Sequence, residues 1–188
     1  EPVNDAALLP NYLIERALGE HVTVALNGTG GDELFAGYGR YFQIPIEQKY
    51  LNIPAWVRCG IEKVIGPISP MRAWQLERAG LFETDRGQYI HAHSTHFPAP
   101  VRDIIDNKSA SPSAAQAIAT RAFLTSFPDA DLQTAGLAGD ISTYLNDDLL
   151  TLLDRTSMAH SVEGRVPFLD HRLVEASLSI SADIRTPG

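Results

Sequence analysis

The sequence predicts a mainly helical α/β protein with one or two strands. A short apolar, β-branched run at residues 21–26 leads through a glycine-rich segment into residues 34–42, which have helical character. This order of strand, loop and helix is the most informative local pattern in the chain. Towards the other end, apolar side chains recur at helical spacing over residues 140–153. Prolines divide much of the region between these two patterns.

The composition is ordinary for a globular protein. The chain has 188 residues, of which 44% are hydrophobic and 20% charged, so one domain or slightly more is expected. Its 15 basic and 23 acidic side chains give a net charge of −8, which disfavours nucleic acid as a partner. No apolar run approaches the ~18 residues that span a bilayer, so no membrane partner is expected. Cys59 stands alone and cannot form an internal disulfide; we expect a buried thiol and a cytoplasmic protein.

The first half of the chain is expected to hold one strand and several short helices. Pro10 suits the first turn of a helix that ends near Gly19, and residues 21–26 are expected to form a buried strand. A helix over residues 34–42 follows. Four prolines then divide the next segment into short helical pieces, the clearest of which covers residues 55–65. These prolines are Pro45, Pro54, Pro67 and Pro70.

The second half is expected to be helical with two interruptions. A helix covers residues 85–97, and a loop rich in serine and proline covers residues 98–114. The segment 161–170 ends the helix of residues 140–153. Asp170 is suited to cap the last helix, which carries three apolar side chains inward. These side chains are Leu173, Val174 and Leu178.

The glycine-rich segment after the first strand is the strongest candidate for a binding site. Gly28, Gly30 and Gly31 let backbone N–H groups approach a ligand closely, and the start of the following helix favours negative charge. Asp32 and Glu33 open that helix, and bare carboxylates repel phosphate unless a divalent cation lies between them. The segment therefore predicts a nucleotide or pyrophosphate site at which Asp32 binds Mg²⁺. The simpler alternative is a tight turn whose acidic residues complement the helix dipole.

Three short glycine motifs can be compared with this segment. The P-loop pattern G-x-x-x-x-G-K-S/T fails because no lysine follows the glycines, and the dinucleotide pattern G-x-G-x-x-G fails because Glu33 stands at its last position. Residues 30–37, Gly-Gly-Asp-x-x-Phe-Ala-Gly, resemble the anion-hole motif of ribokinase-like sugar kinases, whose aspartate is a general base. In that family the motif lies near the C-terminal end of the chain, whereas here it lies near the beginning.

Two longer stretches together resemble a different family. Residues 22–41, VTVALNGTGGDELFAGYGRY, are similar to the pattern V-L-S-G-D/E-G-G/S-D-E-L/V-F-G/A-G-Y in the synthetase domain of asparagine synthetases. Residues 154–174, DRTSMAHSVEGRVPFLDHRLV, resemble the D-R-x-S-M-A-x-S-x-E-x-R-x-P-F-L-D-H segment of the same family. The two stretches have the family's order and separation, while the resemblance is thin over residues 45–135.

The resemblance implies a Rossmann-like ATP-pyrophosphatase domain, of which this chain is a mainly helical part. In the family, ATP adenylates the side-chain carboxylate of aspartate and releases pyrophosphate, and ammonia from glutamine then attacks the acyl-adenylate. Carried over by position, Asn27 and Gly28 contact the adenine nucleotide, and Asp32 is a catalytic residue that binds Mg²⁺ with pyrophosphate. The implied partners are ATP, aspartate, ammonia and a glutaminase domain of the same full-length chain. A homodimer is left open.

Thr29 departs from the family pattern. The family usually has Asp or Glu here, a carboxylate implicated in forming and aminating the β-aspartyl-adenylate. A threonine hydroxyl cannot act as a base near neutral pH, although it can donate or accept a hydrogen bond. Thr29 is a catalytic candidate by position, and the substrate carboxylate is left open. The alternatives are a related amide-forming ligase or amidotransferase with another carboxylate, and a non-catalytic remnant of the fold.

The second stretch is expected to be mainly structural. Glu163 and Arg165 are expected to form a buried ion pair, with each other or with other partners, that fixes the loop before Pro167. The alternative is direct contact with the substrate. His160 is not expected to be catalytic. The core candidates in this stretch are Met158, Val166, Phe168 and Leu169.

A histidine cluster in the middle of the chain is a weaker candidate. His91, His93 and His96 nearly spell the H-x-H-x-D-H zinc motif of metallo-β-lactamase-like hydrolases, but Thr95 replaces the aspartate. Because no complete set of further ligands follows, we expect an ordinary histidine cluster rather than a zinc site.

Several parts of the family pattern do not occur in this sequence. They are the first phosphate loop, S-G-G-x-D-S, the glutaminase domain with its N-terminal cysteine, and a lysine-containing stretch that follows P-F-L-D-H. We therefore expect residues 1–188 to be a partial synthetase domain, cut at both ends, without synthetase activity by itself.

Overall fold

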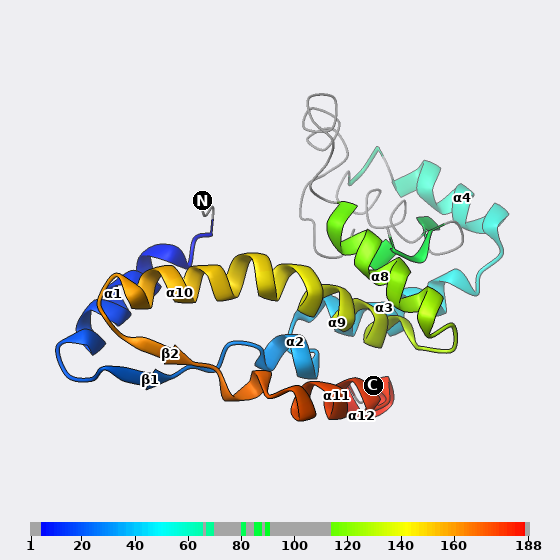
Figure 1. Cartoon of the computed structure of the whole chain (residues 1–188). Coiled ribbons are helices and arrows are strands. Elements are labelled where there is room, and N and C mark those ends of the chain that lie inside the picture. The colour runs from blue at the N-terminus through cyan, green and yellow to red at the C-terminus, as the bar shows by residue number, and fades with distance from the viewer. Residues whose placement is uncertain are drawn as a thin grey trace.

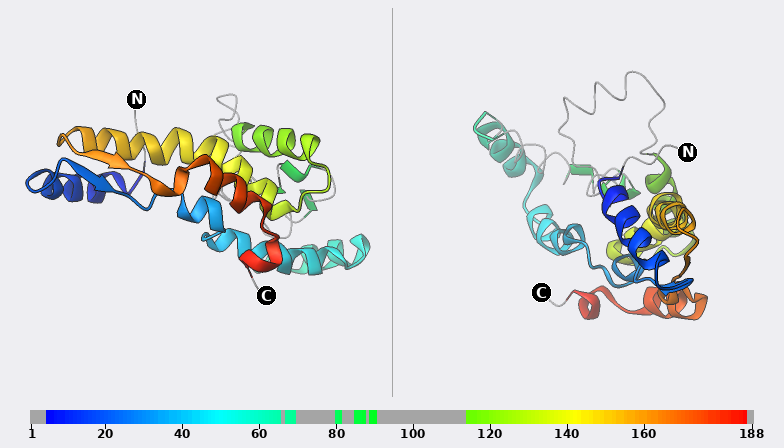
Figure 2. Two further views of the ribbon diagram at one scale, coloured as in Figure 1. Left: turned by 60° about the horizontal axis from the view of Figure 1, so that its bottom comes forward. Right: turned by 90° about the vertical axis from the view of Figure 1, so that its left-hand side faces the viewer.

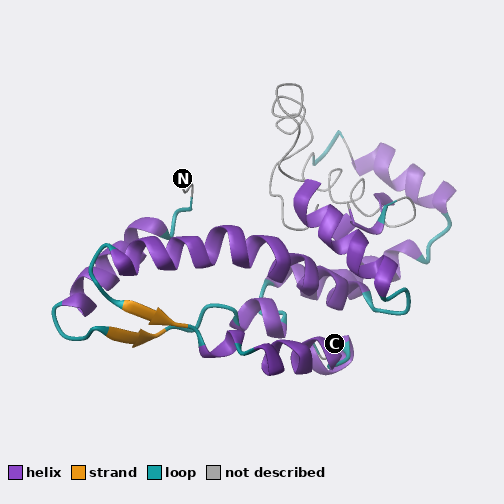
Figure 3. Cartoon of the chain, in the orientation of Figure 1, coloured by secondary structure: helices purple, strands orange, loops and turns teal. Residues whose placement is uncertain are grey.

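The computed structural model describes residues 5–65, 67–69, 80–81, 85–87, 89–90 and 114–186. These residues are mainly helical and contain one pair of parallel strands (Figure 3). The predicted α/β class is confirmed. The elements, labelled as in Figure 1, are α1 (Leu8–Gly19), β1 (Val24–Leu26), α2 (Gly31–Phe35), α3 (Gly39–Leu51), α4 (Ala55–Ile65), α8 (Ala114–Ser126), α9 (Leu132–Asp140), η1 (Ile141–Leu149), α10 (Leu150–Met158), β2 (Glu163–Arg165), η2 (Pro167–Leu169), α11 (His171–Ser179) and α12 (Ala182–Arg185).

A long helical run, α9–η1–α10, crosses the molecule (Figure 1). Asp131 begins it by accepting a hydrogen bond from the backbone N–H of Thr134 at 2.8 Å, which satisfies one of the free donors of the first turn. Its middle part, η1, is a π-helix. The run confirms the predicted helix over residues 140–153 and extends it at both ends. The helix α1 packs against α10 at one end, and α8 packs against α9 at the other.

The two strands are parallel and lie side by side although they are far apart in the sequence. Val24 pairs with Glu163 and Leu26 with Arg165. The predicted strand is thus confirmed over three residues, but the expectation that it is buried is wrong, since 76% of Leu26 is exposed. Alternate side chains of a strand point to opposite faces, and the described residues leave the face of Val24 and Leu26 uncovered.

The expected helix over residues 34–42 is two helices. Ala36 has a left-handed backbone conformation with φ of 57°, which ends α2, and the N–H of Gly37 closes that end by donating to the carbonyl of Asp32 at 3.1 Å. The helix α3 then begins at Gly39 and continues past position 45, so the expectation that Pro45 divides the chain is wrong. Nothing in the described contacts explains this continuity.

The helix α4 has the predicted bounds, 55–65, but not the predicted burial of Cys59. It buries Arg58 and turns Val57 and Ile61 partly inward, whereas the thiol lies on the exposed side of the helix. Of the predicted helix over residues 85–97, positions 86–87 and 89–90 are helical. The remainder of that helix and most of the predicted loop lie outside the described residues.

The main apolar core lies where α2 and α3 meet α9. Leu178 of α11 packs against this core, as predicted for the last helix, and α11 runs beside α2 and α9 (Figure 2). Asp170 caps α11 as predicted by accepting from the N–H of Arg172 at 3.0 Å. The buried residues of the core are Ala36, Tyr41, Ile44, Tyr89, Ile90, Leu132 and Leu137.

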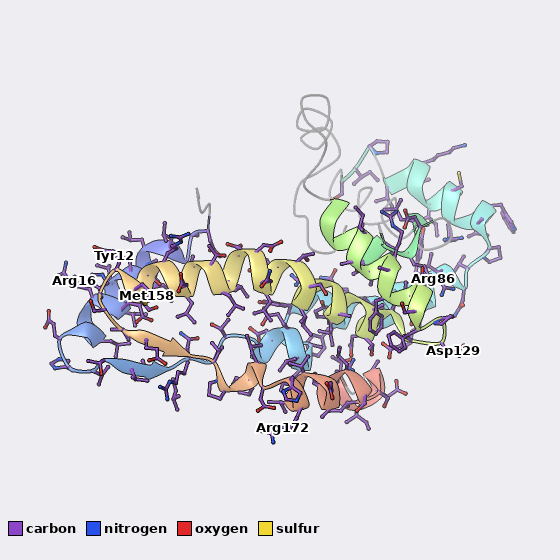
Figure 4. The ribbon with its side chains drawn as sticks, in the orientation of Figure 1. Tyr12, Arg16, Arg86, Asp129, Met158 and Arg172 are labelled. Carbon is purple, nitrogen blue, oxygen red and sulfur yellow. The ribbon has the colours of Figure 1, made fainter. Side chains whose placement is uncertain are left out.

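The core expectations for the second stretch are partly wrong. Met158 is the last residue of α10 and lies near α1 (Figure 4), but it is 60% exposed. Phe168 is also partly exposed, while Val166 and Leu169 are half-buried. The fully buried side chain here is Val162, which stands directly before β2. Among the described residues no helix is long and apolar enough to cross a membrane.

Candidate functional site

The glycine segment and the second stretch meet at one edge of the strand pair. Because β1 and β2 are parallel, the segments that follow them, 27–31 and 166–169, leave the strands at the same edge. The N–H of Asn27 continues the strand ladder by donating to the carbonyl of Arg165 at 2.8 Å. Ligands of open α/β sheets bind at the carboxyl ends of the strands, which is where this edge lies.

Gly30 allows the two segments to pack closely against each other. Its φ is +97°, and a Cβ at this position would lie 2.5 Å from Cδ2 of Leu169. Glycine alone adopts this conformation without strain and leaves room for the leucine. The ring of Phe168 packs edge-to-face on that of Phe35, with centroids 6.4 Å apart. The residues of η2 therefore support both the glycine segment and α2.

Asn27 and Thr29 are joined by two hydrogen bonds. Oδ1 of Asn27 accepts from the backbone N–H of Thr29 at 2.8 Å and from its hydroxyl at 2.6 Å. An asparagine that accepts from the N–H two residues later forms a compact turn. Oδ1 is thus engaged within the loop, so a further contact of this side chain with a ligand would go through Nδ2. The Thr29 hydroxyl is half-buried against this turn.

Asp32 stands exposed in the first turn of α2, at the same edge as the glycine segment. A Cβ at position 37 would lie 1.9 Å from Oδ1 of Asp32, so the absence of a side chain at Gly37 makes the space that this carboxylate occupies. The carboxylate is held close to the backbone that follows α2 and remains open to solvent. Gly28, by contrast, has nothing within 4 Å of a built Cβ, which leaves open space beside the loop.

Glu33 has the opposite environment. Its side chain is buried, and Oε1 accepts a hydrogen bond from the hydroxyl of Tyr38. Burial, followed by this hydrogen bond to a carboxylate, raises the pKa of Tyr38 well above its usual value, so the phenol stays protonated and continues to donate. The two neighbouring acids of the sequence are therefore separated by the fold: Asp32 is available to a ligand, and Glu33 is engaged internally.

A buried polar cluster next to α2 was missed at the sequence level. Arg40 forms an ion pair with Asp140, which is fully buried, and the hydroxyl of Tyr41 donates to the same carboxylate. The guanidinium of Arg40 lies over the ring of Tyr38, 4.2 Å from its centroid. Burial is the largest single influence and opposes the charge of Arg40, but Asp140 and Tyr41 together outweigh it, so the pKa of the guanidinium is raised. A lone aspartate within an apolar helix was the available signal, but spacing could not supply a partner a hundred residues away.

Two other features were predicted from the sequence, the pair of Glu163 and Arg165 and the histidine cluster. Glu163 and Arg165 do pair with each other, with Nε and Oε1 2.7 Å apart, but both side chains are 60% exposed. The expectation of a buried pair is wrong because the two residues lie on the uncovered face of the three-residue strand β2, on either side of half-buried Gly164. His91, His93 and His96 lie outside the described residues. The part of the chain that the structure covers contains no group of three or more side chains suited to hold a metal ion.

Asp32 alone is nevertheless compatible with magnesium. Mg²⁺ is usually bound by one or two carboxylates together with substrate phosphate oxygens and water, not by a complete protein cage. An exposed carboxylate in the space made by Gly37 meets that requirement. Glu33 does not, because its carboxylate is buried and bonded to Tyr38.

The parallel strand pair, with its glycine segment at the carboxyl ends, is consistent with an α/β domain of the ATP-pyrophosphatase kind. The family model described as asparagine synthase matches residues 1–188. The chain belongs to the asparagine synthase family.

Curated relatives agree with this family. The chain is 27% identical over 191 residues to "Asparagine synthetase (glutamine-hydrolyzing) 1" of Bacillus subtilis, a match that covers 99% of this chain and 29% of the relative. It is 32% identical over 171 residues to "Putative asparagine synthetase (glutamine-hydrolyzing)" of Mycobacterium tuberculosis, covering 90% of this chain and 26% of the relative. A shorter match, 56% identical over 44 residues, joins 23% of this chain to 8% of asparagine synthetase of Gallus gallus. No solved structure matches the chain.

Proposed function

We propose that this chain is part of a glutamine-dependent asparagine synthetase. In the proposed reaction ATP adenylates the side-chain carboxylate of aspartate, pyrophosphate leaves, and ammonia displaces AMP to give asparagine. The observation that carries the proposal is the meeting of residues 27–32 with residues 166–169 at the carboxyl ends of two parallel strands. Family membership supports an amide-forming ligase, and the geometry supplies one open edge at which its substrates would bind.

Each residue at this edge has a proposed role that its surroundings support. Asn27, through Nδ2, and Gly28, through its open backbone, contact the nucleotide. Asp32 binds Mg²⁺ together with the phosphates, and the metal would neutralise charge that develops on the leaving pyrophosphate. Thr29 orients a substrate oxygen through its hydroxyl and does not act as a base, since a threonine hydroxyl keeps its proton near neutral pH.

The proposal also concerns the full-length protein to which this chain belongs. The chain spans between a quarter and a third of the length of the curated relatives that it matches over most of its own length. We propose that residues 1–188 are a partial synthetase domain, that a glutaminase domain of the same full-length protein supplies ammonia, and that the isolated chain has no synthetase activity. The full-length protein is proposed to act in the cytoplasm.

Product analysis on the full-length protein tests the function. With ATP, Mg²⁺, aspartate and glutamine, the synthetase proposal expects equal amounts of AMP, pyrophosphate and asparagine. Production of ADP in the presence of a sugar would instead support the kinase alternative. AMP and pyrophosphate with a different carboxylic acid, and not with aspartate, would replace the substrate but keep the ligase. No turnover with any of these would favour a non-catalytic remnant.

Two substitutions test the residue roles. Asp32→Asn removes the charge that binds Mg²⁺ and is expected to lower pyrophosphate release at least ~100-fold, whereas Thr29→Ala removes one hydrogen bond and is expected to lower it by ~10-fold or less. Magnesium affinity, followed by titration with Mn²⁺, should fall in the first variant and not in the second. Small and equal effects at the two positions would contradict the assignment.

A further inference from the structure

Arg40 occupies an unusual place in the described part of the molecule. It is 17% exposed, its charge is paired with fully buried Asp140, and its guanidinium is surrounded by aromatic rings. The carbon at its centre lies 4.2 Å from the ring centroid of Tyr38, 5.3 Å from that of Tyr41 and 5.8 Å from that of Tyr144. A planar, permanently charged group suits such stacking, and a lysine does not.

The contacts of Arg40 continue towards the candidate site. Tyr38, over which the guanidinium lies, donates its hydroxyl to Glu33 in the first turn of α2. Glu33 is the direct neighbour of Asp32, and Gly37, directly before Tyr38, makes the space for the Asp32 carboxylate. A continuous set of contacts thus joins Asp140 in the long helix to the backbone that presents Asp32. None of the links needs Arg40 to touch a substrate.

We propose that Arg40 is a positioning residue, which holds Tyr38 against Glu33 and thereby fixes the first turn of α2 and the orientation of Asp32. The inference rests on the proposed function only where the rate of pyrophosphate release is measured. The contacts of Arg40 are present in the structure whatever reaction the protein catalyses. Replacing Arg40 can change the reaction rate strongly without any contact to the substrate, because a displacement of ~1 Å in a group that must be placed precisely can cost ~100-fold in rate. The long helix is in this way coupled to the metal-binding carboxylate.

The first test uses two variants of the full-length protein in which Arg40 is replaced. In both, the side chains at positions 40 and 140 together keep a net charge of zero. Arg40→Lys retains a cation beside Asp140 but loses the planar stack on Tyr38. The double variant Arg40→Met with Asp140→Asn removes both charges of this ion pair, so neither of the two is left buried without the other. Arg121→Lys is the matched control, because Arg121 also pairs with an aspartate, Asp85, at 2.6 Å, but its side chain is 44% exposed, compared with 17% for Arg40.

Two readouts separate positioning from a general structural role. In both Arg40 variants we expect kcat for pyrophosphate release to fall ~100-fold and the Mg²⁺ concentration at half-maximal rate to rise, while KM for glutamine is unchanged. We also expect hydrogen exchange, followed by mass spectrometry, to become ~10-fold faster in the peptide of residues 30–38 and to stay unchanged in that of residues 22–28. Arg121→Lys should change neither readout.

The outcomes are distinguishable from those of the proposed function. If the wild-type protein releases no pyrophosphate, the proposed function fails, and hydrogen exchange alone decides whether Arg40 positions α2. If the wild type is active and Arg40→Lys matches it in both readouts, the inference is overturned. Faster exchange in both peptides would also overturn it, because it would indicate a general loss of stability. Should the double variant not fold, Arg40→Lys, which keeps the pair with Asp140, decides.

Discussion

The glycine segment is held on its two sides by different kinds of interaction. On the strand side, Gly30 fits against Leu169, and the ion pair of Glu163 and Arg165 is mostly in solvent. On the side of the long helix, α2 and α3 are joined to α9 by the buried charges and hydroxyls of Arg40, Asp140 and their tyrosine neighbours. One side is defined by shape and backbone hydrogen bonds, and the other by a buried polar cluster.

The difference teaches where a charge contributes to this fold and where it does not. An exposed ion pair gains little, since water already solvates both partners and salt screens their attraction. A buried pair also gains little over apolar residues of the same size, but removing one partner alone is costly because the other charge is left without compensation. The strand side should therefore be sensitive to added volume and insensitive to lost charge, whereas the helix side should be sensitive to the loss of one charge of its pair.

The largest expected effect on stability comes from Asp140→Ala. This change leaves the guanidinium of Arg40 without its carboxylate and the Tyr41 hydroxyl without its acceptor, so the free energy of unfolding should fall by about 3–5 kcal/mol. Urea denaturation followed by circular dichroism measures it. Asp147→Ala is the matched control, since Asp147 is exposed on the same helical run and should change stability by less than ~0.5 kcal/mol. Equal losses in the two variants would contradict the contrast between buried and exposed charges.

An intermediate effect is expected from Gly30→Ala on the strand side. The new Cβ meets Leu169 at 2.5 Å, and the backbone at φ of +97° is strained for any residue with a side chain, so the free energy of unfolding should fall by about 1–3 kcal/mol. Adding Leu169→Ala removes the clash but not the strain. The loss caused by Gly30→Ala should therefore be smaller when Leu169→Ala is already present. An unchanged loss in that background would show that Leu169 does not limit the space at Gly30.

The sequence predicts local features of this site well. The strand over three of its residues, the cap at Asp170 and the bounds of α4 follow from side-chain type and spacing alone and are confirmed. These features depend on interactions between residues close together in the chain. The turn at Ala36 shows the limit, because its left-handed conformation is typical of glycine and gave no signal in an apparently helical stretch.

Features that depend on distant contacts are not predictable from one sequence. The predicted burial was wrong for Leu26, Cys59 and Met158, whose residue types are common in cores, and for the pair of Glu163 and Arg165. Whether such a side chain is buried depends on which element packs over it. The link between Arg40 and Asp140 has the same origin, since an arginine and an aspartate a hundred residues apart carry no mark of their pairing.

The smallest expected effect concerns a second exposed pair on the strand side, Asp170 with Arg172, which points outward from α11 (Figure 4). Hydrogen bonds from Arg172, first from its side chain and then from its backbone, lower the pKa of Asp170 from 3.8 to about 2. Because the folded pKa lies below the unfolded one, the stabilisation is complete above pH 3.8 and is lost as the pH falls towards 2.

Asp170→Asn tests this sign, because asparagine caps helices as well as aspartate does but carries no charge. The melting temperature of the variant should lie slightly below that of the wild type at pH 5 and 7, and the difference should vanish as the pH approaches 2. High salt should reduce the difference at pH 7, since the pair is exposed. A difference that persists unchanged at pH 2 would contradict the assignment, because it would mean that the stabilisation does not come from the charge of the Asp170 carboxylate.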